Sequence, residues 1–164
     1  MKQGNSASKP AAKPAVIKIR RACESDLPAL DALYRELKLD EYDTYAPTPA
    51  KLRAGFRRIA GSHDDHLIVA ECEGKVAGTI HVHIFRHLGH GVRPSAIVEN
   101  VVVADAMRSR GIGEKMLEAA GAIAMHERCY KIALTSRTHR SGAHRFYERL
   151  GWRHSHHGFS LALD

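Results

Sequence analysis

The residues with the clearest chemical potential form an R-x-x-G-x-G motif: Arg108, Ser109, Arg110, Gly111, Ile112 and Gly113. The motif stands between a strongly apolar run and a segment with the apolar spacing of a helix. The first N–H groups of a helix have no partner within it, and the helix dipole adds partial positive charge there. Glycine lets a phosphate approach the backbone, and arginine adds charge-assisted hydrogen bonds. The motif therefore predicts a phosphate-binding turn at a helix start.

This motif differs from two other phosphate-binding motifs. A P-loop needs G-x-x-x-x-G-K-[ST], which the sequence lacks. A dinucleotide-binding fingerprint needs a third glycine and an early strand, whereas this motif comes two-thirds of the way along the chain. A glycine-rich turn with solvated arginines and no bound phosphate remains an alternative.

Two further residues could carry proton transfers. Tyr147 lies in a short helical pattern in which Phe146 and Leu150 are expected to face the core, which leaves Tyr147 on a neighbouring face. Glu99 is the carboxylate inside the apolar run AIVENVVVA, where it could act as a general base. A strand carboxylate paired with an arginine accounts for Glu99 equally well.

Histidines gather before that apolar run. His81 and His83 point to one side of a predicted strand, and His87 and His90 follow just beyond it. They could belong to a substrate site or to a weak metal site, or be satisfied or exposed histidines without a function. A histidine pair two residues apart is too little to indicate zinc, so no metal is predicted.

The elements that must position these residues follow from apolar periodicity and turn residues. A strand is predicted from Val16, and a first helix begins at a Ser25 or Asp26 cap. A second helix opens at Thr48-Pro49. The rest of the predicted order is a hairpin over 66–85, a strand over 96–104, a helix over 111–127, a strand over 131–136, a helix over 141–151 and a closing extended segment containing FSLAL. Residues 16–164 are thus predicted to form one domain, and the low-complexity residues 1–15 a disordered or non-native tail.

Charge and composition exclude several classes of protein. The chain of 164 residues carries a net charge of +7, but residues 1–21 contain six basic and no acidic residues, so the remainder is nearly neutral. A nucleic-acid binder would be expected to spread basic charge over a folded face. No apolar run approaches a membrane span or a signal-peptide core, so a cytoplasmic location is expected. The three cysteines form no C-x-x-C pair, so neither a disulfide framework nor a thiolate metal site is indicated.

Together the R-x-x-G-x-G motif and the helical segment that carries Phe146 and Tyr147 resemble the GNAT family of N-acetyltransferases. In that family a strand, an R-x-x-G-x-G/A loop, a helix, a strand and a helix carrying A-x-x-F/L-Y-x-x-x-G-F/W occur in this order, and the resemblance covers residues 16–163. It implies a three-layer α+β fold. The expected sheet is mixed and mostly antiparallel, with six to seven strands and about four helices. Two central strands would splay apart to admit the pantetheine arm of acetyl-CoA.

The resemblance also implies roles for individual residues. Main-chain groups of Val101, Val102 and Val103 would pair with the pantetheine, and residues 108–113 would hold the pyrophosphate. Arg140 and Phe146 join the cofactor-binding set, although many members have asparagine where this chain has Arg140. Tyr147 matches the tyrosine that protonates the departing thiolate. Glu99 lies inside the central strand, and members often have a base near that strand. The implied reaction uses acetyl-CoA as cosubstrate and acetylates a primary amine.

The sequence indicates the acceptor amine less clearly than the acetyl donor. Residues 24–43 carry a local net charge of −5, so Asp40, Glu41 and Asp43 could attract a cationic amine. The histidine-rich stretch HVHIFRHLGH and the ending GAHRFYERLGWRHSHHGFSLAL resemble the aminoalkylphosphonate N-acetyltransferase branch. In that branch the acceptor carries an anion beside its amine, and Arg53, Arg57 or Arg58 could contact it.

Alternatives remain open at this point. A non-catalytic acyl-CoA-binding or regulatory module of the same fold, acetylation of a protein amine, and a histidine-rich metal-binding protein each fit part of the sequence. A homodimer is possible because this family often dimerises. Partners from nucleic acid and membrane are not expected.

Overall fold

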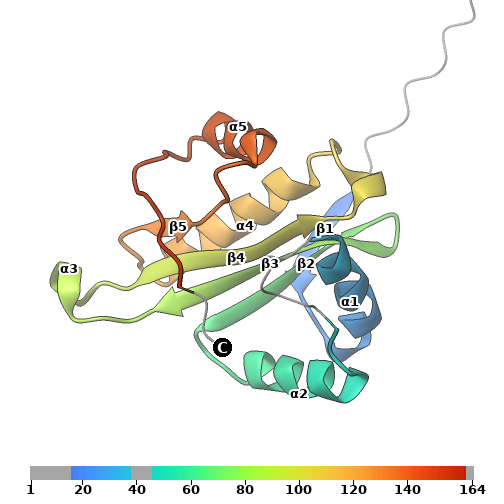
Figure 1. Ribbon diagram of the computed structural model, residues 1–164. Coiled ribbons are helices and arrows are strands. Elements are labelled where there is room, and N and C mark those ends of the chain that lie inside the picture. The colour runs from blue at the N-terminus through green and yellow to red at the C-terminus, as the bar shows by residue number, and fades with distance from the viewer. Residues whose placement is uncertain (1–15, 38–45, 162–164) are drawn as a thin grey trace, which may run out of the picture.

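The computed structural model describes residues 16–37 and 46–161 and contains five strands and five α-helices in those ranges (Figure 1). The strands are β1 (Ile17–Arg21), β2 (Asp65–Cys72), β3 (Lys75–Phe85), β4 (Ser95–Val103) and β5 (Ile132–Leu134). The helices are α1 (Leu27–Glu36), α2 (Pro49–Ala60), α3 (Gly89–Val92), α4 (Ile112–His126) and α5 (Ser141–Arg149), with 3-10 turns at Glu24–Asp26 and Asp105–Met107. None of the helices within the described ranges is long and apolar enough to cross a membrane.

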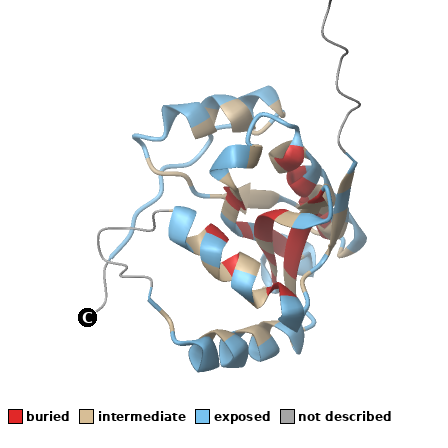
Figure 2. Cartoon of the chain, turned by 90° about the vertical axis from the view of Figure 1, so that its right-hand side faces the viewer, coloured by how far each residue is buried: buried red, intermediate tan, exposed pale blue. Residues whose placement is uncertain are grey.

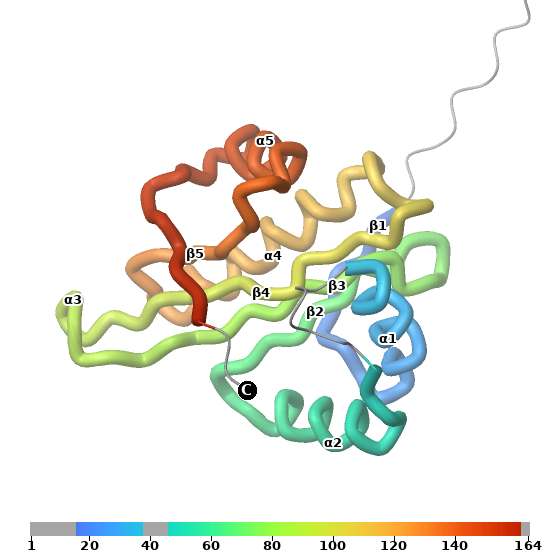
Figure 3. The backbone as a smooth tube through the Cα atoms, in the orientation of Figure 1, coloured from blue at the N-terminus to red at the C-terminus, as the bar shows by residue number. Residues whose placement is uncertain are grey.

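The strands form one mixed sheet in the order β1-β2-β3-β4-β5, and the tube in Figure 3 follows this path. The pairs from β1 to β4 are antiparallel, and only β4 and β5 run parallel. The register places Ile68 opposite Ile80 and Val82 opposite Val98. The predicted mixed, mostly antiparallel sheet is therefore confirmed.

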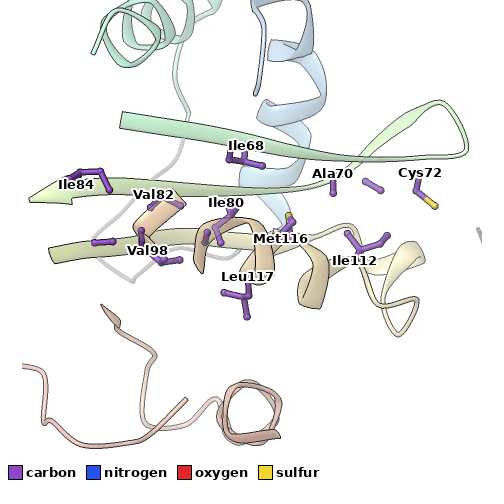
Figure 4. Close-up of a cluster of buried hydrophobic side chains, with 14 residues drawn as sticks. Ile68, Ala70, Cys72, Ile80, Val82, Ile84, Val98, Ile112, Met116 and Leu117 are labelled. Carbon is purple, nitrogen blue, oxygen red and sulfur yellow. The ribbon is translucent and has the colours of Figure 1, made fainter. Parts of the chain in front are cut away.

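Alternating side chains of β2 show how the three layers form. Leu67 and Val69 pack with Leu30 of α1 on one face, and Phe56 and Ile59 of α2 pack against the same cluster. Ile68, Ala70 and Cys72 of β2 lie on the other face, in the large buried cluster that Figure 4 shows. Helix α4 contributes Ile112, Met116 and Leu117 to this cluster. In Figure 2 the buried residues gather in the centre, while the outward faces of the helices are exposed. Period-two alternation thus divides the apolar residues between two helical layers.

Gly78 in β3 marks the closest packing in this core. A Cβ at this position would lie 2.9 Å from the carbonyl oxygen of Val102 and 3.1 Å from Cε of Met116. Any larger residue would push β3 away from β4 and α4. Glycine inside a strand is otherwise unfavourable, so the close approach explains its presence here.

Asp26 holds β1 against the start of α1. The guanidinium of Arg20 donates two hydrogen bonds to its carboxylate, at 2.7 and 2.9 Å, and the Cys23 N–H donates a third at 2.8 Å. The Arg20 hydrogen bonds lower the pKa of the nearly buried Asp26 to about 2, with burial opposing them. Asp26 therefore closes the 3-10 turn, and its side chain does not cap α1 as the sequence had suggested.

The sheet is smaller than predicted. The family resemblance predicts six to seven strands, whereas the described ranges contain five. The closing segment forms no strand as far as Leu161. Phe159 and Leu161 are 97% and 85% exposed. A segment with alternating apolar residues forms a strand only where it can pair with the edge of another strand and pack its apolar face. β5 has three residues, so the edge that it offers for pairing is short.

Candidate active site

β4 and β5 separate in the middle of β4. β5 pairs only with Ala96, Ile97 and Val98, whereas β4 continues to Val103 (Figure 1). In the described ranges no β5 residue pairs with Glu99 to Val103. The segment that includes Val101, Val102 and Val103 therefore presents a strand edge to the opening, where an extended ligand can pair with the main chain. This separation is the splaying that the resemblance implied.

A β-bulge lies at the same point. Asn100 has a φ of 53°, and the register between β3 and β4 shifts between Thr79 and His81. An inserted residue bends a strand and re-aims the side chains beside it. The bulge thus follows directly after Glu99, the candidate base, and precedes the valines at the opening.

The R-x-x-G-x-G motif forms the turn into α4. Ser109 and Gly111 have φ values of 61° and 79°, and α4 begins at Ile112 with no side chain capping it. The left-handed Gly111 position is one that glycine adopts without strain. The first-turn N–H groups of α4 are thus not engaged by a capping side chain, the arrangement that favours an anion.

The two arginines of this turn are held by acidic side chains. Arg110 Nη1 lies 3.1 Å from Glu73 Oε1, which belongs to the turn between β2 and β3. Arg108 pairs with Asp105 and also donates to the Val103 carbonyl at 3.3 Å. Both ion pairs are exposed, and such pairs contribute little stability, so a phosphate can displace them at small cost.

Gly113 has a different role from Gly111. A Cβ on Gly113 would lie 3.0 Å from Cζ of Phe146, so α4 and α5 meet where this side chain is missing. The guanidinium carbon of Arg149 lies over the Phe146 ring, 5.7 Å from its centroid. Nη1 of Arg149 also lies 3.8 Å from Oε2 of Glu114 in α4. The structure therefore places Phe146 in the contact between the two helices that carry the two motifs.

This contact positions Tyr147, the next residue. Its ring lies against those of Phe146 and Trp152, with centroid distances of 5.4 and 6.1 Å. Burial raises the pKa of Tyr147, Arg140 opposes this effect, and the charge of Glu99 adds to it. Tyr147 therefore keeps its proton at neutral pH and is able to donate it.

Glu99 lies near enough to Tyr147 for its charge to raise the pKa of that phenol. Glu99 is solvent-accessible, yet partial desolvation of its carboxyl group raises its pKa, which positive charge on His81 opposes. A carboxylate with a raised pKa is a better proton acceptor than an ordinary surface glutamate. The described structure gives Glu99 no arginine ion pair, the alternative role that the sequence left open.

Sequence reasoning missed Asp65. Its Oδ1 lies 2.8 Å from Nε2 of His81 and 3.0 Å from Nδ1 of His83, and the register pairs His81 with Glu99. Two histidines at i and i+2 share one side of a strand, so an acid on that side of the neighbouring strand was the signal to look for. Across residues 16–37 and 46–161, no group of three or more His, Cys, Asp or Glu side chains has an arrangement suited to a metal ion.

Other predicted residues lie on α2, at the start of α5 or outside the described ranges. Arg53 and Arg57 of α2 pair with Glu24 at 3.0 and 3.2 Å, and α2 packs against β2. Arg140 stands at the start of α5, where its charge reaches Tyr147. Asp40, Glu41 and Asp43, proposed to attract the amine, lie outside the described residues.

Known proteins are similar to this chain in sequence and in fold. Residues 30–152 match the acetyltransferase (GNAT) family. An aminoalkylphosphonate N-acetyltransferase from Salmonella typhimurium is 33% identical over 148 residues, which cover 90% of this chain and 92% of the relative.

Solved structures agree with this match. A putative acetyltransferase from Agrobacterium tumefaciens superposes with a TM-score of 0.81 at 31% identity, covering 89% of this chain and 99% of that one. The glucosamine-6-phosphate N-acetyltransferase of Arabidopsis thaliana superposes with a TM-score of 0.80 at 25% identity, covering 91% and 99%. The sequence match over most of the chain, the mixed sheet and the turn into α4 establish that this chain belongs to the acetyltransferase (GNAT) family.

Proposed function

We propose that this protein transfers the acetyl group of acetyl-CoA to a primary amine of a small molecule, by direct attack within a ternary complex. The observation that carries the proposal is the β4 edge from Glu99 to Val103, which β5 leaves unpaired. The R-x-x-G-x-G turn at the start of α4 and the charge of Glu99 acting on Tyr147 support it. In this proposal a strand edge, an anion-binding helix start, a proton acceptor and a proton donor act together.

Acetyl-CoA fits this opening by its chemistry. Its pantetheine arm is an extended chain with amide groups, which can hydrogen-bond to the main chain of Val101, Val102 and Val103 as an added strand does. Its pyrophosphate carries negative charge to the turn at Arg108 to Gly113, where Arg108 and Arg110 exchange Asp105 and Glu73 for phosphate oxygens. In this proposal Phe146 supports the turn from behind and Arg140 adds positive charge.

The reaction follows from the two proton-transfer groups. A protonated amine has no lone pair, so Glu99 first accepts a proton from it. The amine nitrogen then attacks the thioester carbonyl, and a C–N bond forms. The C–S bond breaks as the carbonyl reforms, and the departing thiolate takes the proton of Tyr147. The nitrogen then loses its second proton, which restores the hydroxyl of Tyr147. The products are an N-acetylated amine and free CoA, and bulk water takes the proton held by Glu99.

The acceptor class that we favour is the aminoalkylphosphonates. The support is the 33% identity to the Salmonella typhimurium enzyme over nine-tenths of the chain, together with the similar histidine-rich stretch and ending. Arg53 and Arg57 of α2 form exposed ion pairs with Glu24 of the 3-10 turn. An anion can displace pairs of this kind at small cost, so both arginines stay candidates for contacting the phosphonate.

A thiol-release assay tests the proposal. Purified protein is mixed with acetyl-CoA and, in turn, aminoalkylphosphonates, polyamines, amino acids, aminoglycosides and a lysine peptide, and products are identified by mass spectrometry. We expect amine-dependent thiol release with one acetyl group added to a small amine. Binding of acetyl-CoA without turnover on any amine would instead support a non-catalytic module, and turnover on the peptide alone would support a protein acceptor.

The Tyr147→Phe variant tests the acid role, because it removes the hydroxyl and keeps the ring contacts with Phe146 and Trp152. We expect kcat to fall about tenfold or more with little change in the KM for acetyl-CoA. An unchanged kcat would remove Tyr147 from the proposed mechanism. The Tyr130→Phe variant is a matched control outside the opening, where Tyr130 stacks on His90 at 4.0 Å.

A further inference from the structure

Asp65, His81 and Glu99 come from three neighbouring strands and lie on one face of the sheet. Ile80, Val82 and Val98 belong to the buried cluster on the α4 side, so the alternation of side chains places His81 and Glu99 on the opposite face. The register pairs His81 directly with Glu99, and such pairs have Cβ atoms about 4.5–5.5 Å apart. An acid, an imidazole and a second acid therefore follow one another from β2 to β4.

The hydrogen bond to Asp65 fixes the tautomer of His81. Burial raises the pKa of Asp65, but hydrogen bonds from Ser62, His83 and His81 outweigh it and hold the pKa below its usual value. Asp65 is thus a carboxylate at neutral pH, which can only accept hydrogen bonds. The 2.8 Å contact then assigns a proton to Nε2 of His81. In the neutral ring this leaves Nδ1 with a lone pair, free to accept a second proton.

We propose that His81 receives the amine proton from Glu99 and passes it to solvent, and that Asp65 is the positioning residue that orients His81. This inference rests on the proposed acetyl transfer and deepens it. The N–H bond of the ammonium breaks and its proton binds Glu99. The proton then moves to Nδ1 of His81, and the resulting imidazolium is paired with the carboxylate of Asp65. Loss of that proton to water returns both residues to their starting states.

Several ionisable groups surround His81. Asp65 approaches from β2, His83 lies next to it on β3, and Glu99 lies opposite on β4. Tyr34 of α1 bonds Thr79, two residues before His81, and Tyr147 of α5 senses the charge of Glu99. Removing the His81 cation takes away the charge that lowers the pKa of Glu99, so that pKa rises.

His83 provides a matched control within the same chain. It lies on the same strand and the same face, and its Nδ1 lies 3.0 Å from the same Asp65 oxygen. Its cross-strand partner, however, is Ile97, which cannot exchange a proton. A purely structural histidine–aspartate contact predicts similar effects for both histidines, whereas a relay predicts an effect for His81 alone.

The test compares wild type, His81→Asn, His83→Asn and Asp65→Asn with acetyl-CoA and the best amine of the thiol-release panel. We expect His81→Asn to lower kcat about tenfold or more, with the KM for acetyl-CoA within about twofold. The acidic limb of its kcat/KM profile should move to higher pH. His83→Asn should keep kcat within about threefold and leave that limb in place.

Asp65→Asn keeps the imidazole but removes its anionic partner, so it serves as a second variant if His81→Asn fails to fold. It should lower kcat in the same direction, with the acetyl-CoA-induced thermal shift retained. Equal kcat values and pH profiles for His81→Asn and His83→Asn, in a protein whose wild type is active, would overturn the relay and leave the proposed function standing. A wild type that acetylates no amine would overturn both.

Discussion

The two edges of β4 differ in what they contact. Towards β3, β4 is paired from Ser95 to Val103, whereas towards β5 it is paired only from Ala96 to Val98. We call the first the closed side, which includes β1 to β3 and the core against α4, and the second the open side, which includes Glu99 to Val103, the turn 108–113 and Tyr147. On the closed side the strands pair along their lengths and their apolar side chains pack in the core. The open side leaves main-chain groups, arginines and a proton acceptor for ligands.

This difference predicts that substitutions in the core of the closed side change stability, whereas those on the open side, and at the Asp65–His81 pair opposite Glu99, change catalysis. A variant that affects the wrong property would break the comparison. The following tests run from the largest expected effect to the smallest.

Gly78→Ala should be the most damaging change on the closed side. Its Cβ would meet the Val102 carbonyl oxygen at 2.9 Å, and backbone of this kind cannot move aside cheaply. We expect the free energy of unfolding to fall by about 3 kcal/mol, measured by urea denaturation. Gly121→Ala in α4 is the control, because no atom lies within 4 Å of its added Cβ. That control should gain up to about 1 kcal/mol, and equal losses in both variants would contradict the packing argument.

Glu99→Gln should be the most damaging change to catalysis on the open side. The amide keeps the size of the side chain but cannot accept the amine proton. We expect kcat to fall about 100-fold or more, equivalent to about 2.7 kcal/mol, with stability unchanged. Glu118→Gln, which loses only an exposed pair with Lys115, should keep full activity. A fall in stability without a fall in kcat would place Glu99 among the structural residues.

Asp26→Asn tests the closed side through pH. The pKa of Asp26 is about 2 in the folded protein and about 3.9 when unfolded, so its ionised form stabilises the fold by about 2 kcal/mol at neutral pH. Because the folded pKa is the lower one, this stabilisation is present above pH 4 and is lost as the pH falls towards 2. Thermal melts of wild type and variant should therefore converge in that window.

The Asp31→Asn variant is the control for this pair, because Asp31 forms an exposed pair with Arg35 four residues later. It should cost about 0.5 kcal/mol or less at neutral pH. A pH-independent gap between wild type and Asp26→Asn would show that the Arg20 pair is not the cause.

Arg110→Gln should have the smallest of these effects. The arginine is exposed and paired only with Glu73 among the described residues, so its removal leaves the fold intact. We expect the KM for acetyl-CoA to rise about tenfold, equivalent to about 1.4 kcal/mol, while kcat stays within about twofold. Arg86→Gln, which loses pairs with Asp64 and Glu127, should leave that KM unchanged.

Much of the closed side could be predicted from local sequence. The spacing of Leu30 and Leu33, the Thr48-Pro49 start and the Glu73-Gly74-Lys75 turn encode helices and a hairpin within a few residues, and each is present. The closing segment, predicted as a strand, forms none as far as the described residues reach, to Leu161, because pairing depends on an edge that local sequence does not describe. The edge available to the closing segment is short because β5 has only three residues.

The functional residues of the open side could be predicted only where they belong to a sequence motif. The turn at 108–113 and Tyr147 stand out by spacing, and the structure joins them through Gly113 and Phe146. Asp65 was missed because its importance arises from strand register, which pairs residues far apart in the chain. Register brings together His81 and Glu99 in the same way.

Hydrogen–deuterium exchange with and without acetyl-CoA tests the central claim most directly, because it reports which backbone amides the ligand protects. We predict slower exchange at residues 99–103 and 109–115 when acetyl-CoA is bound, with the amides of Ile68 and Ile80 on the closed side unchanged. Protection confined to other segments, or no protection at saturating acetyl-CoA, would contradict the assignment of the opening beside β4 as the cofactor site.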